Sequence, residues 1–239
     1  MKCYMVSEPY LRWDGFVEFL KDEGIEEQAA ASFVHTGSGS ALPEIGGRLC
    51  YMSFGKGRKT NKEYLDNIIK QRHFSVLEHS NWSFIITGVS RSFTHELVRH
   101  RHLSFSQLSQ RYVDESESLF ILPEAVANNS EYVSIALDAL DASLHSYKEL
   151  VKNLDASLAS SEMSPTERRK AARQAARAVL PNATETKIMV TGNARAWREF
   201  VEKRNSPHAD PEIQNVAREL LRQLHLSAPN LFADMVGGE

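Results

Sequence analysis

The segment NWSFIITGVSRSFTHELVRHRHLSFSQLSQRY (residues 81–112) contains the change of pattern that decides the fold class. Residues 81–89 alternate and are rich in aromatic and β-branched side chains, which predicts a strand. Residues 91–101 carry apolar side chains on one helical face, which predicts a helix that ends near the arginines. Residues 102–115 are polar and serine-rich, so we expect a loop. The segment therefore indicates a chain that uses both strands and helices.

Outward from this segment the chain is mostly helical. Helical spacing of apolar residues predicts helices over residues 14–22, 61–71, 131–154 and 193–203. Ser164-Pro165-Thr166-Glu167 is a strong start signal for a helix to about residue 179, and Asp210-Pro211 starts another. Residues 186–191 predict a short strand. We expect an α+β fold in a single domain, residues 1–239, with a small, mainly antiparallel sheet flanked by long helices.

The composition is that of an ordinary globular protein. Hydrophobic residues make up 42% of the chain, yet no apolar run approaches the ~18–20 residues of a membrane span. The net charge of -3 disfavours a global electrostatic grip on nucleic acid or acidic lipid, so neither is expected as a partner. Cys3 and Cys50 are too few for a disulfide framework, and no export signal is visible. We expect a cytoplasmic protein.

Three short motifs imitate cofactor sites without their geometry. In residues 36–47, a Gly-Ser-Gly triplet lacks the third glycine of a dinucleotide fingerprint, and Pro43 stands where the helix should run, so we expect a loop. Gly55-Lys56-Gly57 lacks the P-loop spacing and predicts a turn. His95 and His100 are five residues apart, which turns them off a common helical face. We therefore expect no metal site.

The chemically densest stretch is residues 99–112, which combines arginines, histidines, serines and glutamines. Arginine recognises phosphate through two parallel hydrogen bonds, and Ser, Gln and backbone N–H groups can complete such a cradle. The alternative is a solvated basic helix end, and composition alone gives the two interpretations about equal weight.

Further polar clusters are residues 72–79, the stripe Arg169, Arg173 and Arg177, residues 193–195, and residues 203–208. Taken alone, the histidines of the first cluster are most simply explained as hydrogen-bonded structural residues. The arginine stripe is most simply explained as an exposed charged face. Neither cysteine stands in a context that would activate it as a nucleophile.

Together these clusters resemble the flavin-dependent thymidylate synthases (the ThyX family), and their detailed sequence is close to that of the actinobacterial branch. The family signature is Arg-His-Arg, seven residues and then Ser, which here is Arg99-His100-Arg101 through Ser109. Residues 73–79, 176–181, 193–195 and 204–208 follow in the family's order. The resemblance covers about residues 46–226.

This resemblance implies the conversion of dUMP to dTMP. The one-carbon donor would be methylenetetrahydrofolate, and NADPH would supply reducing equivalents through FAD. Since hydride passes from the reduced flavin to the nucleotide, the product folate would be tetrahydrofolate. The resemblance also implies a homotetramer with active sites between subunits, and a reaction that needs neither a Rossmann fingerprint nor a cysteine nucleophile.

The resemblance assigns roles residue by residue. The expected dUMP contacts are Glu96, Leu97, Val98, Arg99, Gln107, Leu108, Ser109, Gln110, Arg111, Arg177 and Arg204. The expected FAD contacts are Ser75, Arg99, His100, Arg101, Gln107, Asn193, Ala194, Arg195 and Glu199. His73 and His208 are expected near the flavin or the folate. Arg169 and Arg173 receive no such role and are expected to stay solvated.

The chemical role is assigned to Arg204. A guanidinium beside the N3 and O2 edge of uracil would stabilise negative charge as the ring accepts or loses electron density. Ser109 is assigned to binding rather than to nucleophilic attack. Ser106, Gln107 and Glu199 stand where many family members carry other residues, so contacts there are expected to differ in detail.

Two other functions remain open from the sequence. A nucleotide- or RNA-binding module would use the arginine-rich helices without catalysis, although Phe105 and Tyr112 are the only aromatic residues in the basic loop. A different flavin- and folate-dependent transfer to a pyrimidine would keep the cofactor and change the product. The presence of bound flavin would distinguish a flavin-dependent thymidylate synthase from the binding module. Analysis of the product would distinguish it from an enzyme that catalyses a different transfer.

Overall fold

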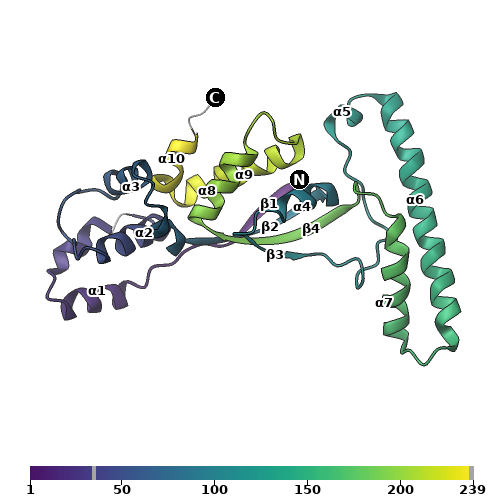
Figure 1. Cartoon of the computed structure of the whole chain (residues 1–239), viewed down its shortest axis with the longest axis horizontal. Coiled ribbons are helices and arrows are strands. Elements are labelled where there is room, and N and C mark those ends of the chain that lie inside the picture. Colours follow the sequence, from purple (N-terminus) through teal and green to yellow (C-terminus); the bar gives the residue numbers. More distant parts are fainter. Residues whose placement is uncertain (34–35, 237–239) are drawn as a thin grey trace. The chain divides into compact units, whose positions relative to one another are not determined.

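The computed structural model describes residues 1–33 and 36–236 and contains a four-stranded antiparallel sheet (Figure 1). The strands are β1 (Lys2–Ser7), β2 (Asn81–Ser90), β3 (Ser104–Gln107) and β4 (Glu185–Asn193), in the order β1-β2-β4-β3. The central strands β2 and β4 are the two that the sequence predicts; β4 alternates buried with more exposed side chains, whereas β2 is buried at most of its positions. The α+β class is confirmed.

The edge strand β3 lies in residues 102–115, where the prediction of a loop is therefore wrong in part. Its sequence, SFSQ, is half exposed and carries no run of apolar side chains. An edge strand pairs on one side only, so it needs no hydrophobic pattern to be held in place. The pairing continues past it, where the Leu108 N–H donates to the Lys187 carbonyl at 2.9 Å.

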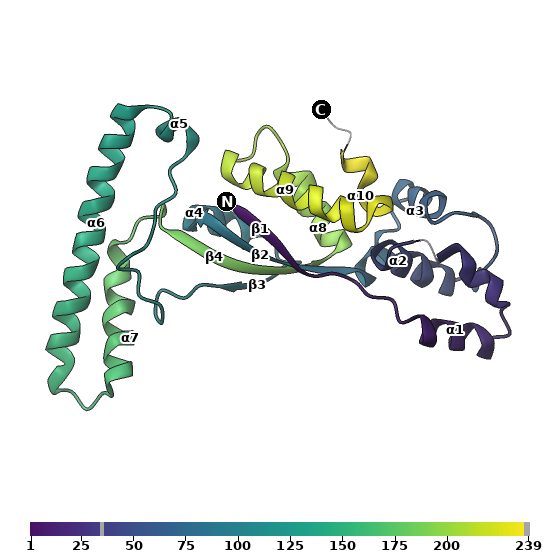
Figure 2. The same ribbon diagram turned by 180° about the vertical axis from the view of Figure 1, so that it is seen from behind.

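The chain divides into two compact units, and each is described by itself. Unit 1 comprises residues 1–2, 86–99 and 106–188. Its helices are α4 (Arg91–Leu97), α5 (Glu124–Ala127), α6 (Ser130–Ser157), η3 (Leu158–Ser160), α7 (Pro165–Ala176) and η4 (Arg177–Val179). The long helices α6 and α7 run side by side in opposite directions (Figures 1 and 2).

The ends of the unit 1 helices follow the local sequence. The Asn129 side chain accepts the N–H groups at the start of α6. Ser164 and Glu167 form a capping box at the start of α7, with Pro165 in the first helical position, as the sequence predicts. The helix α4 ends at Leu97, so the arginines of the signature follow it in a turn rather than in its last turn of helix.

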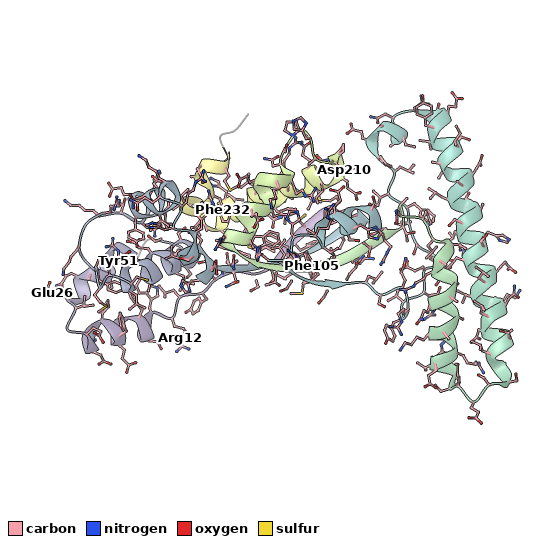
Figure 3. The ribbon with its side chains drawn as sticks, in the orientation of Figure 1. Arg12, Glu26, Tyr51, Phe105, Asp210 and Phe232 are labelled. Carbon is pink, nitrogen blue, oxygen red and sulfur yellow. The ribbon has the colours of Figure 1, made fainter. Side chains whose placement is uncertain are left out.

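Unit 2 comprises residues 3–85, 100–105 and 189–239, of which 34–35 and 237–239 lie outside the described residues. Its helices are α1 (Trp13–Asp22), η1 (Glu27–Phe33), α2 (Ser38–Leu49), α3 (Asn61–Lys70), η2 (Phe74–His79), α8 (Ala194–Arg204), α9 (Pro211–Ser227) and α10 (Pro229–Val236). In its core, the ring of Phe84 packs edge-on against Trp197, with ring centroids 5.3 Å apart. The ring of Trp82 packs against Phe232, which is labelled in Figure 3, with ring centroids 5.9 Å apart.

The helix α2 occupies residues predicted to form a loop, so that prediction is wrong. Pro43 lacks the N–H that would bond the Gly39 carbonyl one turn earlier. The Ser80 hydroxyl donates to that carbonyl instead, at 2.7 Å. The glycines of α2 permit close packing, since a Cβ on Gly47 would lie 2.2 Å from the Tyr64 hydroxyl. Because η1 rather than a strand precedes α2 among the described residues, the segment is still not a dinucleotide fingerprint.

Candidate active site

The residues assigned to dUMP and FAD fall into both units, and each group is described within its own unit. Unit 1 holds Glu96, Leu97, Val98, Arg99, Gln107, Leu108, Ser109, Gln110, Arg111 and Arg177. Unit 2 holds His73, Ser75, His100, Arg101, Asn193, Ala194, Arg195, Glu199, Arg204 and His208. Every residue of the first group is an expected nucleotide contact, and the second group consists mainly of expected flavin contacts.

In unit 1, the loop of residues 107–111 is fixed to its neighbours by hydrogen bonds. The Gln107 amide donates from Nε2 to the Thr94 hydroxyl of α4 at 3.0 Å. The Leu108 N–H reaches the Lys187 carbonyl of β4 at 2.9 Å. A loop tied to a helix and a strand holds its remaining donors in a defined position, which a binding site requires.

Two of these remaining donors are buried. Gln110 is only 6% exposed, and its Nε2 has no hydrogen-bond partner among the described residues. The Nε of Arg111 is also buried, and it likewise lacks a partner in the described part of the chain. A buried N–H without an acceptor is costly, and an anionic group would supply acceptors to both donors. This donor set fits a phosphate group.

Arg173 is a structural residue, so the expectation that it stays solvated is wrong. Its guanidinium donates to the Tyr112 carbonyl at 2.8 Å and to the Asp114 carboxylate at 2.9 Å. Burial by itself would raise the pKa of Asp114, but hydrogen bonds from Ser116 and Arg173 outweigh it and lower the pKa. Arg173 thereby ties α7 to the chain just after the 107–111 loop, a contact that the four-residue stripe could not reveal.

In unit 2, the expected catalytic Arg204 contacts the Arg-His-Arg signature. Arg204 is the last residue of α8, and its Nε donates to Nε2 of His100 at 2.9 Å. The His100 ring packs edge-on against Phe200, with ring centroids 5.0 Å apart. This hydrogen bond requires an unprotonated Nε2 on the imidazole. The two residues, distant in the sequence, therefore act as one fixed pair.

The turn that carries His100 packs closely against β4. A Cβ added to Gly192 would lie 2.3 Å from Cδ2 of Leu103 and 3.3 Å from Nε1 of Trp197. The Leu103 N–H donates to the His100 carbonyl at 3.0 Å, which closes the turn. Glycine at position 192 thus allows the signature to approach the strand that leads into Asn193.

A cavity of about 170 Å³ lies beside this turn, lined by Glu78, His102, Asn193, Arg195, Ala196 and Glu199. The Asn193 Oδ1 accepts the Ala196 N–H at 2.9 Å and so caps α8. Arg195 donates to Glu78 at 2.6 Å. A hydrogen bond from Lys203 at 2.5 Å lowers the pKa of Glu199, so its carboxylate is ionised and its charge is balanced.

This small cavity shares two of its lining residues with a larger cavity. Arg195 and Glu199 also line a cavity of about 670 Å³ that reaches Arg72 and Asp234. The smaller volume lies below the ~300 Å³ at which ordinary ligand pockets begin, so alone it would hold only part of a dinucleotide. A guanidinium, an amide and a carboxylate are donors and acceptors that fit the polar edge and the phosphate groups of a flavin nucleotide.

The remaining candidates of unit 2 do not line the small cavity. Ser75 and Arg101 are exposed, and the Ala194 side chain is fully buried. His73 lines a different cavity of about 400 Å³, and His208 is exposed in the turn between α8 and α9. Their roles stay predictions.

Sequence reasoning gave no role to Glu78 or His102, although both line the small cavity. Both stand in clusters that the sequence singles out, residues 72–79 and 99–112. The hydrogen bond between Arg195 and Glu78 is visible only in the folded structure.

The described residues also bear on other kinds of site. Within them, no group of three or more His, Cys, Asp or Glu side chains is arranged to hold a metal ion. No helix in residues 1–33 or 36–236 is both long and apolar enough to cross a membrane.

Comparison with known proteins identifies the family. Residues 34–230 match the family described as thymidylate synthase complementing protein. A flavin-dependent thymidylate synthase of Mycolicibacterium vanbaalenii is 54% identical over 199 residues, which cover 82% of this chain and 79% of the relative. That of Mycobacterium tuberculosis strain H37Rv has the same identity and coverage. The resemblance drawn from the Arg-His-Arg signature, including its actinobacterial type, is confirmed. The chain belongs to the thymidylate synthase complementing protein family, together with these mycobacterial flavin-dependent thymidylate synthases.

Proposed function

We propose that this chain is a thymidylate synthase that converts dUMP to dTMP with FAD as its cofactor. Methylenetetrahydrofolate is the proposed one-carbon donor and NADPH the proposed reductant, with tetrahydrofolate as the second product. The proposed assembly is a homotetramer with active sites between subunits, located in the cytoplasm. Family membership over residues 34–230 supports the reaction, and the chemistry of the two residue groups supports its ligands.

The observation that carries the proposal is the hydrogen bond between Arg204 and His100. The two residues come from separate motifs of the family pattern, and they meet at 2.9 Å. A purely solvated basic helix end would leave the His100 ring free in water, but it packs against Phe200 instead. The fixed position of His100 supports a built site at this part of the signature, although Arg99 and Arg101 on either side of it are exposed.

Each group of residues has a separable task. In unit 1, the donors of Gln110 and Arg111, with Arg177, would hold the phosphate of dUMP. In unit 2, Asn193 and Arg195 would hold polar groups of FAD beside the His100 turn. When bound, the flavin supplies the redox chemistry of the reaction.

Arg204 has the electrostatic task. Its Nε is engaged by His100, which fixes the plane of the guanidinium and so the direction of its outer N–H groups. A positioned guanidinium stabilises negative charge that develops on a pyrimidine ring, without itself transferring a proton. Neutral His100 is suited to this position, since a protonated imidazole would lose the hydrogen bond and repel the arginine.

The test replaces Arg204 with Ala and with Lys and uses Arg222→Ala as the matched control. Arg222 is an exposed arginine on α9 that forms an ion pair with the half-buried Glu219. We expect Arg204→Ala to keep its flavin spectrum and to lose about 10²- to 10³-fold in the rate of dTMP formation. Arg204→Lys keeps a charge but has no planar Nε donor for His100, so its rate should be intermediate.

Two outcomes contradict parts of the proposal. Near-normal dTMP formation by Arg204→Ala removes the electrostatic role of this residue. Bound flavin in the parent protein without any dTMP keeps the cofactor and refutes the substrate. The control variant separates a loss of activity in Arg204→Ala from a general effect of removing a surface arginine.

A further inference from the structure

Arg72, just past the end of α3, holds a backbone conformation that residues with a side chain rarely adopt. Its φ is 59°, in the left-handed region. Its N–H donates to the Ile69 carbonyl at 3.0 Å, and the N–H of His73 donates to the Ile68 carbonyl at 3.0 Å. This pair of hydrogen bonds is the Schellman motif, in which the left-handed position is usually glycine because a Cβ is unfavourable there.

The turn itself does not require an arginine at position 72. Glycine would close the same turn without strain. A positive charge near the end of a helix is favourable, but Lys70 already supplies one in the last turn of α3. A side chain kept at a strained position points to a function rather than to stability. The arginine is therefore explained by what its side chain reaches.

The Arg72 side chain lines the cavity of about 670 Å³ in unit 2, together with two other arginines. Arg195 is paired with Glu78 at 2.6 Å, and Arg198 is paired with Asp234 at 2.6 Å. Arg72 forms no ion pair within residues 1–33 and 36–236, and its side chain is exposed. Its charge is thus available to a ligand in the cavity.

The rest of the lining indicates the kind of ligand. Phe74, Leu77 and Val201 give the cavity an apolar part, and its volume lies within the ~300–1,000 Å³ of ordinary ligand pockets. An apolar wall and one available guanidinium fit a ligand that has a flat ring and an anionic group. Arg195 and Glu199 also line the small cavity proposed for the flavin, so a ligand in the larger cavity lies beside the flavin.

We propose that Arg72 binds the anionic group of a co-substrate in this cavity, and that the strained turn is kept for this purpose. The inference rests on the proposed function, which names two co-substrates with a ring and an anionic group. NADPH carries phosphates, and methylenetetrahydrofolate carries the carboxylates of its glutamate. A guanidinium forms two parallel hydrogen bonds with either group.

The test measures binding to the flavin-loaded protein. The affinity for NADPH is taken from the concentration dependence of anaerobic flavin bleaching, and NADH, which lacks the 2′-phosphate, is the paired probe. The affinity for methylenetetrahydrofolate is measured by calorimetry. The variants are Arg72→Gly, which removes the guanidinium and the strain, and Arg72→Lys, which keeps a positive charge.

Met52→Gly is the matched control, because Met52 is also in the left-handed region, with a φ of 42°. It follows α2 in the same unit, and the N–H groups of Met52 and Ser53 donate to the Leu49 and Arg48 carbonyls. Met52 does not line the 670 Å³ cavity. It therefore reports what the loss of a strained side chain at a helix end does by itself.

We expect Arg72→Gly to weaken the binding of one co-substrate by about 10- to 100-fold, the worth of a charge-assisted pair of hydrogen bonds. A loss larger for NADPH than for NADH identifies the 2′-phosphate as the partner of Arg72. A loss confined to methylenetetrahydrofolate identifies the glutamate carboxylates. Arg72→Lys should be intermediate, and Met52→Gly should bind both co-substrates as the parent does. The Tm of Arg72→Gly should not fall below that of the parent, since relief of the strain offsets the greater freedom of the unfolded chain.

Unchanged affinity for both co-substrates in Arg72→Gly overturns the proposal. An equal loss for FAD, dUMP and both co-substrates also overturns it, as does a lowered Tm, since either result shows that Arg72 supports the fold instead. Failure of the proposed reaction gives a different result. A parent that forms no dTMP, while Arg72→Gly still weakens one co-substrate, refutes the reaction and leaves the anion site in place.

Discussion

Arg48 offers the sharpest test of how unit 2 is held together. Its Nε donates to the Glu44 carboxylate at 2.6 Å, and the two side chains are 4% and 0% exposed. The rest of its guanidinium donates to the carbonyls of Ser53, Lys56 and Arg58 at 2.7–2.8 Å. One buried side chain thus fixes the loop between α2 and α3 and neutralises a fully buried carboxylate.

Arg48→Met keeps the length of the side chain and removes all of these donors. The three carbonyls lie in a partly exposed loop and can bind water, so losing the hydrogen bonds from Arg48 costs them little. The buried Glu44 charge dominates, and removing one partner of a buried ion pair costs about 3–5 kcal/mol. Glu44 keeps a hydrogen bond from Asn61 at 2.8 Å, which places the expected loss toward the lower end.

The assay is denaturant unfolding followed by tryptophan fluorescence. Arg12→Met is the control, because Arg12 forms an ion pair with Asp14 that is exposed on both sides, and we expect no measurable change. The double variant Glu44→Gln/Arg48→Met should be more stable than Arg48→Met, since no buried charge is left unpaired. Equal stability of Arg48→Met and the parent refutes the reasoning, and so does a double variant that is no more stable than the single one.

Three further predictions follow from single contacts. Burial raises the pKa of Cys3 to about 12, and Glu219 adds to the effect. A thiol reagent at pH 8 should therefore label exposed Cys50 and leave Cys3 unlabelled until the chain is unfolded. Equal labelling rates of the two cysteines in the folded chain would show that Cys3 is not protected. Asp114 has a lowered pKa in the folded state, so its bond to Arg173 stabilises the fold above about pH 4, the unfolded pKa, and is lost as the pH falls through the lower folded value. The difference in Tm between the parent and Asp114→Asn should therefore be present at pH 6 and vanish in acid, and a difference independent of pH would contradict the assignment. Gly192→Val should weaken flavin binding, because the added side chain displaces the His100 turn. A flavin affinity equal to that of the parent would contradict this.

The predictable part of the fold is the part whose signals are local. The strands at 81–89 and 186–191 are marked by buried β-branched and aromatic side chains, and the structure has strands there. The helix from Pro165 is marked by its capping box, which forms as written. These features depend on neighbours in the sequence, so spacing alone reveals them.

The missed part depends on contacts that are distant in the sequence. In α2 the Ser80 hydroxyl bonds the Gly39 carbonyl that Pro43 leaves without its helical donor, and no pattern within residues 36–47 contains that serine. The edge strand β3 is held by pairing with β4 rather than by an apolar pattern of its own.

The same distinction applies to the candidate site. The Arg-His-Arg signature and the other motifs that follow the family's order indicate the family, which the comparisons confirm. The contacts of Arg204 with His100 and of Arg195 with Glu78 join segments more than a hundred residues apart, so spacing could not predict them. The role of each individual site residue remains a prediction for the variants described above, and so does the single domain over residues 1–239.

The most direct measurement of the central claim follows the flavin and both products in one anaerobic reaction. Purified protein is reconstituted with FAD, reduced with NADPH, and then given dUMP and methylenetetrahydrofolate. The account predicts flavin bands that bleach with NADPH, and dTMP formed together with an equal amount of tetrahydrofolate. Absence of bound flavin after reconstitution, or dTMP accompanied by dihydrofolate, would contradict it.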